Sequence, residues 1–459
     1  MDWRPAVLGA APVIAVLAWV ALRGHERAAP VAPPPAASAP KMQPDGRATV
    51  RVFDEGQPAK RRVVFHAVDG SILESVETGD DGKAPGPIMQ GAMITVAYGT
   101  SVRELVTIGG VVANDELLVG EDEDEGSAEK VLCTAMVSVP ALPPGATRAH
   151  VTLGTGATEI AADKPLPMSV FERYLDDKKR FRVLAEALDE QGKTIAWSQA
   201  WADGCNREAG SVEVKLEGWK KELRPFAIAV SNPGEAVALH SEIAVHHGDL
   251  DRFLRRKNEQ RPPFGKETRF ELPPAILEGG TSLAYRIELF TTSPFEWSKG
   301  PIERTVLTER MSPSATPPET IAIDLATRML PRVTAPALET TSDPARPFVS
   351  FRIPSREGTN AAPIDADAVI VHVRWPRTRE HLWTLILPPN GPRRVRLPAL
   401  PDTLKDWRPD GRDVTVSVGL VDASEWSSFD DVRKKGIAEL NELDEGASIR
   451  WSLAGEADF

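Results

Sequence analysis

The sequence predicts a mainly β protein, in which tandem immunoglobulin-like β-sandwich domains follow a single N-terminal transmembrane helix. Three observations carry this prediction: short runs that alternate apolar and polar residues, frequent turn residues, and one apolar run without charge near the amino terminus. The 459 residues include 40 prolines and 34 glycines, which punctuate chains that turn often. This length exceeds one ordinary core, and an apolar content of 42% is enough for several domains.

The amino terminus carries the apolar run, at residues 6–22. At 1.5 Å per residue, about 17 helical residues are just long enough to cross a bilayer core. The same run suits the apolar region of a cleaved signal peptide. Cleavage of a signal peptide requires small residues just before the cleaved bond, and the bulky Trp19 lies at such a position. This favours an uncleaved anchor in the inner membrane. Residues 23–45 then form a linker whose Ala- and Pro-rich part makes a stiff, extended spacer.

Two features point to opposite sides of the membrane for the body of the protein. Arg23 and Arg27 follow the apolar run, and the positive-inside rule then favours a cytoplasmic body. The Ala/Pro-rich spacer instead suits domains that stand off the outer face of the inner membrane. We expect a single-pass inner-membrane protein with a periplasmic body, and the cytoplasmic orientation stays open.

Residues 46–120 predict the first sandwich. Val50 and Val52 alternate with Arg51, which is the period of a half-buried strand, and turn signals follow at 69–70 and 80–82. In its order of strands, Asp54-x-Gly56-x-Pro58, Asp69-Gly70 and Thr78-x-x-Asp81-Gly82, the segment resembles the carboxypeptidase regulatory-like family of bacterial sandwiches. The resemblance implies a seven-stranded fold and a non-catalytic role, and it implies no peptidase activity.

The rest of the chain divides by its charge runs, prolines and a weak repeat. Three elements recur in order: a strand ending at a proline turn, an alternating strand, and a Trp-Ser pair at 197–198, 297–298 and 426–427. This order is similar to the later half of fibronectin type III domains. The predicted segments are an acidic hinge at 121–129, sandwiches at 130–220 and 221–310, a linker at 311–335, and a sandwich at 336–459 with a short helix near 429–443.

Catalytic signatures appear only as near-misses. Gly192-Lys193-Thr194 resembles the end of a phosphate-binding loop, but it joins two predicted strands and opens no helix. The histidine group at 240, 246 and 247 does not converge if it lies along one strand. We therefore predict no catalytic, cofactor-binding or metal-binding residue, and an enzyme of unrecognised type remains an alternative.

The two cysteines, Cys133 and Cys205, lie near the ends of the second predicted sandwich. So few cysteines exclude a disulfide scaffold and a four-cysteine zinc site. One bridge between them is compatible with an oxidising compartment, and two separate buried thiols are equally compatible with the sequence.

The last predicted domain holds the candidate binding surface. Trp383 and Trp407 lie in polar, proline-rich stretches, where exposed indoles would serve a protein or sugar ligand. Arginines gather in the same region and could meet an acidic partner: Arg377, Arg379, Arg393, Arg394 and Arg396. The net charge of -12 argues against nucleic acid as the main partner. We expect a non-catalytic, membrane-anchored envelope protein that acts as a protein-interaction or scaffold module; the alternative ligand is a polysaccharide.

Overall fold

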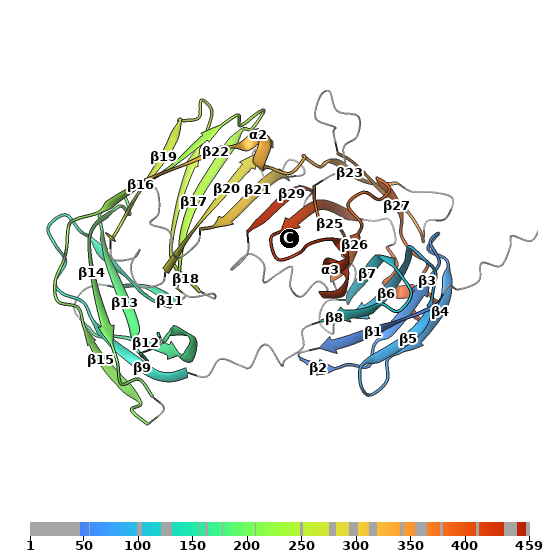
Figure 1. Cartoon of the computed structure of the whole chain (residues 1–459), viewed down its shortest axis with the longest axis horizontal. Helices are drawn as coiled ribbons and strands as arrows, with labels where there is room; N and C mark the ends of the chain where they lie inside the picture. Colours follow the sequence, from blue (N-terminus) through green and yellow to red (C-terminus); the bar gives the residue numbers. More distant parts are fainter. Residues whose placement is uncertain are drawn as a thin grey trace, which may run out of the picture. The chain divides into compact units, whose positions relative to one another are not determined.

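A computed structural model describes the chain from residue 46 to residue 455 (Figure 1), with gaps at 55, 99–102, 121–130, 155, 161–163, 177, 207, 248–250, 275–280, 293–301, 312–318, 340–342, 344, 354–364, 377–379, 410–412 and 436–447. The predicted anchor at 6–22, the linker at 23–45 and the acidic hinge lie outside the described residues. Among the helices that are described, none has the length and apolar character needed to cross a bilayer.

The first sandwich pairs a sheet built on β1 with a four-stranded sheet of order β4-β3-β6-β7. β1 runs antiparallel to β5 and parallel to β8. Gly70 and Gly82 adopt positive φ at the two predicted turns, which a side chain would disfavour. The strands are β1 (Gly46–Asp54), β2 (Gln57–Pro58), β3 (Arg62–His66), β4 (Ile72–Glu77), β5 (Lys83–Ile88), β6 (Ala92–Tyr98), β7 (Arg103–Val111) and β8 (Glu116–Val119).

The second sandwich repeats this strand order, with sheets β12-β9-β15 and β11-β10-β13-β14. Gly192 closes the β13–β14 hairpin at positive φ, so the Gly-Lys-Thr sequence is a turn, as predicted. The elements are β9 (Val131–Ser138), β10 (Arg148–Leu153), β11 (Gly156–Ile160), β12 (Leu166–Phe171), the 3-10 helix η1 (Glu172–Tyr174), β13 (Phe181–Leu188), β14 (Thr194–Ala202) and β15 (Ser211–Lys215).

The third sandwich again has this order, with sheets β19-β16-β22 and β18-β17-β20-β21. Its seventh strand, β22, falls inside the predicted linker 311–335; that boundary is wrong because Thr320–Asp324 pairs in parallel with β16. The strands are β16 (Arg224–Ser231), β17 (Ala238–His247), β18 (Asp251–Gln260), β19 (Glu267–Leu272), β20 (Thr281–Phe290), β21 (Ile302–Arg310) and β22 (Thr320–Asp324).

The fourth sandwich keeps the order of the four-stranded sheet, here β26-β25-β28-β29, and its other sheet is β23-β24-β27. It differs in one strand: β23, the first of the sandwich, pairs antiparallel with β24 at the place where the last strand of the other three sandwiches pairs in parallel. The three later sandwiches therefore share the order of their four-stranded sheets, and the fourth departs from the others only in the strand that completes its second sheet. The first half of the helix predicted at 429–443 is present as α3, and residues 436–443 lie outside the described residues. The elements are α2 (Leu325–Arg328), β23 (Thr334–Glu339), β24 (Phe348–Arg352), β25 (Ala368–Pro376), β26 (Glu380–Leu387), β27 (Arg394–Arg396), the 3-10 helix η3 (Asp402–Trp407), β28 (Thr415–Ala423), α3 (Phe429–Lys435) and β29 (Ile449–Gly455).

One sheet of 12 strands joins three of the sandwiches, in the order β18-β17-β20-β21-β29-β28-β25-β26-β7-β6-β3-β4. β26 of the fourth sandwich pairs in parallel with β7 of the first, and β29 pairs antiparallel with β21 of the third. The predicted β-sandwiches are present, and the last sandwich joins the first and the third edge to edge. Strands that are buried on both faces read as continuous apolar runs, as in Val369–Val371.

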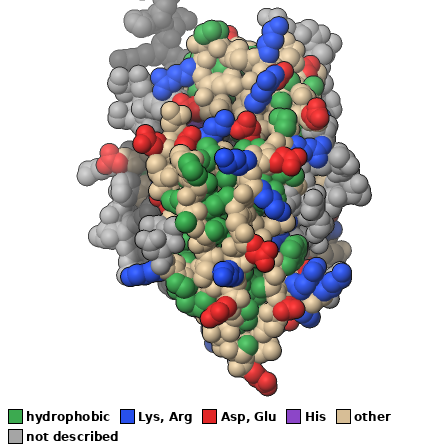
Figure 2. All heavy atoms as spheres, turned by 90° about the vertical axis from the view of Figure 1, so that its left-hand side faces the viewer, with side chains coloured by type: hydrophobic (Ala, Val, Ile, Leu, Met, Phe, Trp, Pro, Cys, Tyr) green, Lys and Arg blue, Asp and Glu red, His purple; other side chains and the backbone are tan. Residues whose placement is uncertain are grey.

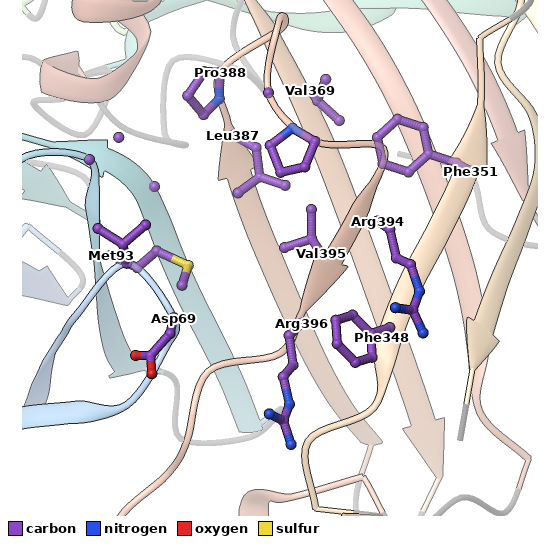
Figure 3. Close-up of a pocket in the computed structure, with 16 residues that line it drawn as sticks. Asp69, Met93, Phe348, Phe351, Val369, Leu387, Pro388, Arg394, Val395 and Arg396 are labelled. Atoms are coloured by element: carbon purple, nitrogen blue, oxygen red, sulfur yellow. The ribbon is translucent and has the colours of Figure 1, made fainter. Parts of the chain in front are cut away.

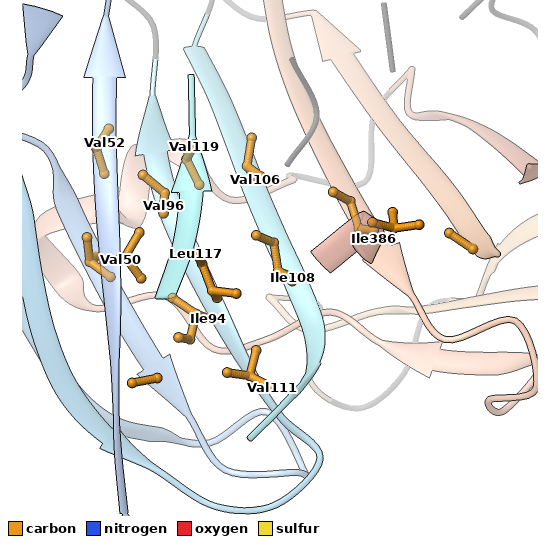
Figure 4. Packing of buried hydrophobic residues seen from close by; sticks show 14 of the residues in the cluster. Val50, Val52, Ile94, Val96, Val106, Ile108, Val111, Leu117, Val119 and Ile386 are labelled. Carbon is orange, nitrogen blue, oxygen red and sulfur yellow. The ribbon is translucent and has the colours of Figure 1, made fainter. Parts of the chain in front are cut away.

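The first and fourth sandwiches share hydrophobic cores on both faces of this sheet. On one face, Val50 and Ile94 of the first sandwich belong to the same buried cluster as Ile370 and Ile386 of the fourth (Figure 4). On the other face, Leu105 joins the core of the fourth sandwich. Because neither core is complete without the other sandwich, we treat the two as one packed unit.

Candidate binding groove between the first and last sandwiches

A buried chain of hydrogen bonds crosses the β7–β26 junction. The indole N–H of Trp383 donates to Thr107 Oγ1 over 2.8 Å, and Thr107 lies 2.8 Å from Thr95 Oγ1. The chain ends at His66 Nε2, 2.9 Å from Thr95. All four side chains are buried, and burial lowers the pKa of His66 to about 3. The imidazole is therefore neutral, and the network holds the two sandwiches in register.

A buried ion pair fixes the same junction from α3. The guanidinium of Arg433 lies 3.2 Å from both carboxylate oxygens of Asp115, and it also donates to the Gly110 carbonyl. The two side chains are only 4% and 5% exposed. A charge buried to this degree is tolerated only with its partner in place, so this pair ties the fourth sandwich to the β7–β8 turn.

The β3–β4 turn docks on the fourth sandwich through its backbone. Arg346 Nη2 donates to the Asp69 carbonyl over 2.7 Å, and its Nε donates to the Leu397 carbonyl. The amide of Ala399 donates to the Gly70 carbonyl over 2.8 Å. These bonds place the turn beside β27 and set one wall of a groove.

The groove is an open cavity of about 460 Å³ between the two sandwiches. In Figure 3, Met93 and Asp69 lie on one side and Phe348 and Phe351 on the other, with Val395 between them. A volume of this size fits the lower range of ligand pockets. The lining is mostly apolar: Val68, Asp69, Gly91, Met93, Gly109, Gly110, Phe348, Phe351, Val369, Leu387, Pro388, Gly391, Pro392, Arg394, Val395 and Arg396.

Two arginines and an aromatic ring form the polar side of the groove. The guanidinium of Arg394 lies 3.9 Å from the centre of the Phe348 ring, and that of Arg396 lies 5.6 Å from it. Each arginine also pairs with a carboxylate: Arg394 with Glu339 at 2.8 Å and Arg396 with Asp343 at 3.2 Å. Arg394 keeps 55% of its side chain exposed, so it can still reach a ligand.

Among the described residues beside the groove, positive charge is in slight excess. Four guanidiniums, of Arg346, Arg393, Arg394 and Arg396, meet three carboxylates, of Asp69, Glu339 and Asp343. Burial lowers the pKa of Arg346, and the nearby charge of Arg396 lowers it further. On a chain with net charge -12, this local excess favours an anionic group in the ligand.

The structure brings together only part of the predicted binding surface. Arg394 and Arg396 line the groove, whereas Arg393 donates to the Pro389 carbonyl and lies over Phe351. Trp407 is half-buried, and the guanidinium of Arg103 lies 5.6 Å from its ring. Arg377 and Arg379 lie outside the described residues.

The expectation of an exposed Trp383 is wrong. Its side chain is fully buried, because β26 has β25 on one side and β7 on the other, and its N–H bonds within the junction. Its proline-flanked stretch suggested a surface, but both neighbouring strands come from distant parts of the sequence. Met93, Phe348 and Phe351 were not anticipated as lining residues, since nothing in the sequence links the first sandwich to the last.

The chemistry that the groove offers is recognition. Its lining supplies apolar contacts, two guanidiniums and one carboxylate, a set that binds and orients a ligand. Within the described ranges, no group of three His, Cys, Asp or Glu side chains is arranged to hold a metal ion.

Cys133 and Cys205 form a disulfide in the second sandwich, with Cα atoms 5.6 Å apart. The bridge joins β9 to the segment after β14, and both sulfurs lie in the buried core of this sandwich. Of the two arrangements that the sequence left open, the structure has the bridged one.

No protein-family model and no curated protein matches the chain. Among solved structures, similar ones include the Bacillus anthracis TIE protein, at 10% identity and TM-score 0.14 over 61% of this chain and 50% of that one. A DUF3823 family protein of Bacteroides ovatus matches at 9% identity and TM-score 0.13, over 53% of this chain and 90% of that one. A Bacteroides ovatus protein described as a putative adhesin matches at 10% identity and TM-score 0.16, over 47% and 98%. TM-scores this low carry no inference about function.

Proposed function

We propose that this chain is a non-catalytic interaction protein of the bacterial envelope, which captures a partner protein in the groove between its first and last sandwiches. The captured segment carries an apolar side chain next to a carboxylate. The observation that carries the proposal is the combination of an apolar floor with the exposed guanidinium of Arg394 at its edge. Apolar burial supplies affinity, and the guanidinium selects an acidic neighbour.

The position of the groove supports this role. Its walls come from two sandwiches that are locked together by the Arg433–Asp115 pair and the Trp383–Thr107 bond, so the site is formed before the ligand arrives. A preformed site avoids much of the ordering entropy that weakens binding by loops. The polysaccharide alternative has less support, because Trp383 offers no exposed ring.

The membrane anchor at 6–22 and the periplasmic orientation are part of the proposal. The Cys133–Cys205 disulfide supports the periplasmic side, since such bridges persist in oxidising compartments. Protease treatment of spheroplasts with a sealed inner membrane checks the orientation through a carboxy-terminal tag. Loss of the tag is expected, and its survival until the membrane is broken would place the body in the cytoplasm.

Photocrosslinking in cells tests the groove itself. Val68 lines the groove and is 54% exposed, so a photoreactive p-benzoylphenylalanine at this position should capture the partner. Val237 in the third sandwich, 40% exposed, is the matched control and should not capture it. The adduct should disappear in Arg394→Glu, while Arg269→Glu, which removes an exposed arginine paired with Glu267, should leave it unchanged.

Labelled peptides then test the chemistry of the ligand. A short peptide with leucine next to two glutamates should bind the purified full chain, and replacement of its glutamates by lysines should weaken binding at least tenfold. Equal adducts at positions 68 and 237, together with no binding of any peptide, would reject the proposal.

A further inference from the structure

We infer that the partner segment binds in the groove as an added β-strand, antiparallel to β27 and hydrogen-bonded to the outer edge of that strand. The segment carries an apolar residue between two acidic ones: the acidic side chains lie opposite Arg394 and Arg396, and the apolar side chain lies opposite Val395. The inference rests on the proposed function, because it names the form in which a partner of the same groove is recognised.

The first observation is which residues of β27 line the groove. Successive residues of a strand point to opposite faces of its sheet, so a cavity above one face is lined by alternate residues. Arg394, Val395 and Arg396 are successive, and all three line the groove. Figure 3 shows them one after another along β27, with Met93 and Asp69 across the cavity. The groove therefore lies beside the edge of β27, where another strand would pair.

Hydrogen bonds at both ends of β27 fix its pairing with β24. The Phe351 amide donates to the Arg393 carbonyl over 3.1 Å, and the Leu397 amide donates to the Pro347 carbonyl over 3.0 Å. Along an antiparallel strand, the backbone groups of every second residue point to the same neighbour. The odd-numbered residues from 393 to 397 therefore bond to β24, and the even-numbered ones point outward.

The outward edge of β27 is a short stretch of unpaired backbone. Arg394 and Arg396 each present one N–H donor and one carbonyl acceptor there. In the described part of the chain, the sheet ends at β27, and none of these groups has a hydrogen-bond partner. Pro392 and Pro398 stand at the next outward positions and lack an N–H. The prolines confine pairing to the residues between them, so the edge can receive a strand of a few residues.

The arginines of this edge select acidic residues in the added strand. Residues directly opposite each other on neighbouring strands share a face of the sheet, where opposite charges stabilise the pair. The guanidiniums of Arg394 and Arg396 already meet Glu339 and Asp343, but a guanidinium has five N–H donors and can hold a second carboxylate. Two acidic residues of the partner, separated by one residue, therefore fit opposite the two arginines.

Val395 selects the residue between the two acidic ones. Its side chain points to the other face of β27, where it belongs to the buried core of the fourth sandwich and lines the groove with Val369 and Leu387. A partner side chain on that face exchanges water for an apolar surface, with Met93 across the cavity (Figure 3). The partner segment therefore alternates acidic and apolar residues, as a strand with one buried face does.

The charge of β27 favours such a partner over a second copy of this chain. Antiparallel pairing of β27 with itself would place arginine opposite arginine, and like charges directly opposite each other are destabilising. Among the described residues on the face seen in Figure 2, Lys and Arg side chains are interspersed with Asp and Glu, so no charge of one sign dominates there. The groove differs from that face in its excess of guanidiniums, which attracts a segment with carboxylates.

Amide-to-ester replacement in a peptide with the sequence Glu-Leu-Glu tests the pairing. Binding to the purified full chain is followed by fluorescence polarisation. In the antiparallel pairing, both glutamate amides donate to β27 and the leucine amide points away. An ester at either glutamate removes one donor and keeps the side chain, so it should weaken binding about fivefold. An ester at the leucine is the matched control and should weaken binding less, because it removes no donor to β27.

A pair of variants tests the same edge from the side of the protein. Arg394→Ala and Arg394→Pro both lack the guanidinium, and only the proline variant also lacks the outward N–H. The proline variant should therefore bind the peptide about fivefold more weakly than the alanine variant. Thermal melts check that both variants keep the fold, which we expect because this N–H bonds to no residue of the described chain.

The possible failures are distinguishable. If no unmodified peptide binds, the proposed function fails and this inference fails with it. If the peptide binds but the glutamate esters cost no more than the leucine ester, the groove recognises side chains alone, and only the added strand is rejected. A dimer of the chain that Arg394→Pro abolishes would make a second copy the occupant of this edge and would also overturn the inference.

Discussion

Trp383 in β26 donates its indole N–H to Thr107 in β7, 276 residues earlier in the chain, and both side chains are buried. This bond lies in the middle of the parallel pairing that joins the last sandwich to the first. The groove exists only while this junction is intact, because its two walls come from different sandwiches. Stability of the junction and binding in the groove are therefore linked.

The hydrogen bond itself can be measured. Thr107→Val keeps the shape of the side chain and leaves the indole N–H and Thr95 without their shared partner. An unsatisfied buried group costs about 1 to 3 kcal/mol, and we expect the free energy of unfolding to fall by that amount. Urea unfolding checks this, and in a double-mutant cycle Thr107→Val should cost less when Trp383→Phe is already present. Additive effects would mean that the bond contributes nothing.

The ion pair from α3 should contribute more than any surface pair. Arg433→Met leaves the Asp115 carboxylate buried without its partner, which typically costs about 3 to 5 kcal/mol. The control Arg269→Met removes an exposed arginine paired with Glu267 and should cost less than about 1 kcal/mol. Chemical denaturation of both variants gives the comparison, and a loss for Arg433→Met as small as that of the control would contradict the assigned role.

Acid should loosen the same junction through His66. Burial holds the pKa of this imidazole at about 3 in the folded chain, below its usual value of 6.5. The unfolded chain therefore binds more protons between these values, so stability is complete above pH 6.5 and falls as pH decreases toward 3. By pH 5 the loss from this group is about 2 kcal/mol. His66→Gln should reduce the difference in melting temperature between pH 7.5 and pH 5; an unchanged difference would show that His66 is not responsible.

Asp367 should act in the opposite direction. Burial raises the pKa of this carboxyl to about 6, from 3.8, and the charges of Asp422 and Asp365 add to the effect. The folded chain then binds more protons than the unfolded chain between pH 4 and pH 6, so this group lowers stability as pH rises through that window. Asp367→Asn keeps an oxygen to accept from the Ala423 amide, which the carboxylate accepts at 2.9 Å. Thermal melts should show a gain for this variant at pH 7.5 that vanishes near pH 4.

Local patterns predicted the local structure well. The turns at Gly70, Gly82 and Gly192 follow from residues close in the sequence. The junction between the first and last sandwiches could not be predicted in this way. The strands that pair there, β7 and β26, are far apart in the chain, and no periodic pattern of residues indicates that their edges meet. For the same reason, the sequence predicted only one wall of the groove, through Arg394 and Arg396. Nothing in the sequence indicated that Met93 would line the opposite wall.

The disulfide of the second sandwich gives a final prediction that also bears on location. The bridge closes a loop with a sequence separation of 72, so its removal in Cys133→Ala/Cys205→Ala should lower stability by about 4 kcal/mol in the chain-entropy model. Because the second sandwich shares no strand pairing with the first or the fourth among the described residues, peptide binding in the groove should persist in this variant. Denaturation with and without reductant measures the first effect, and fluorescence polarisation of the acidic peptide measures the second. Loss of peptide binding upon reduction would mean that the second sandwich supports the groove after all, whereas two free thiols in protein taken directly from cells would place the chain in a reducing compartment.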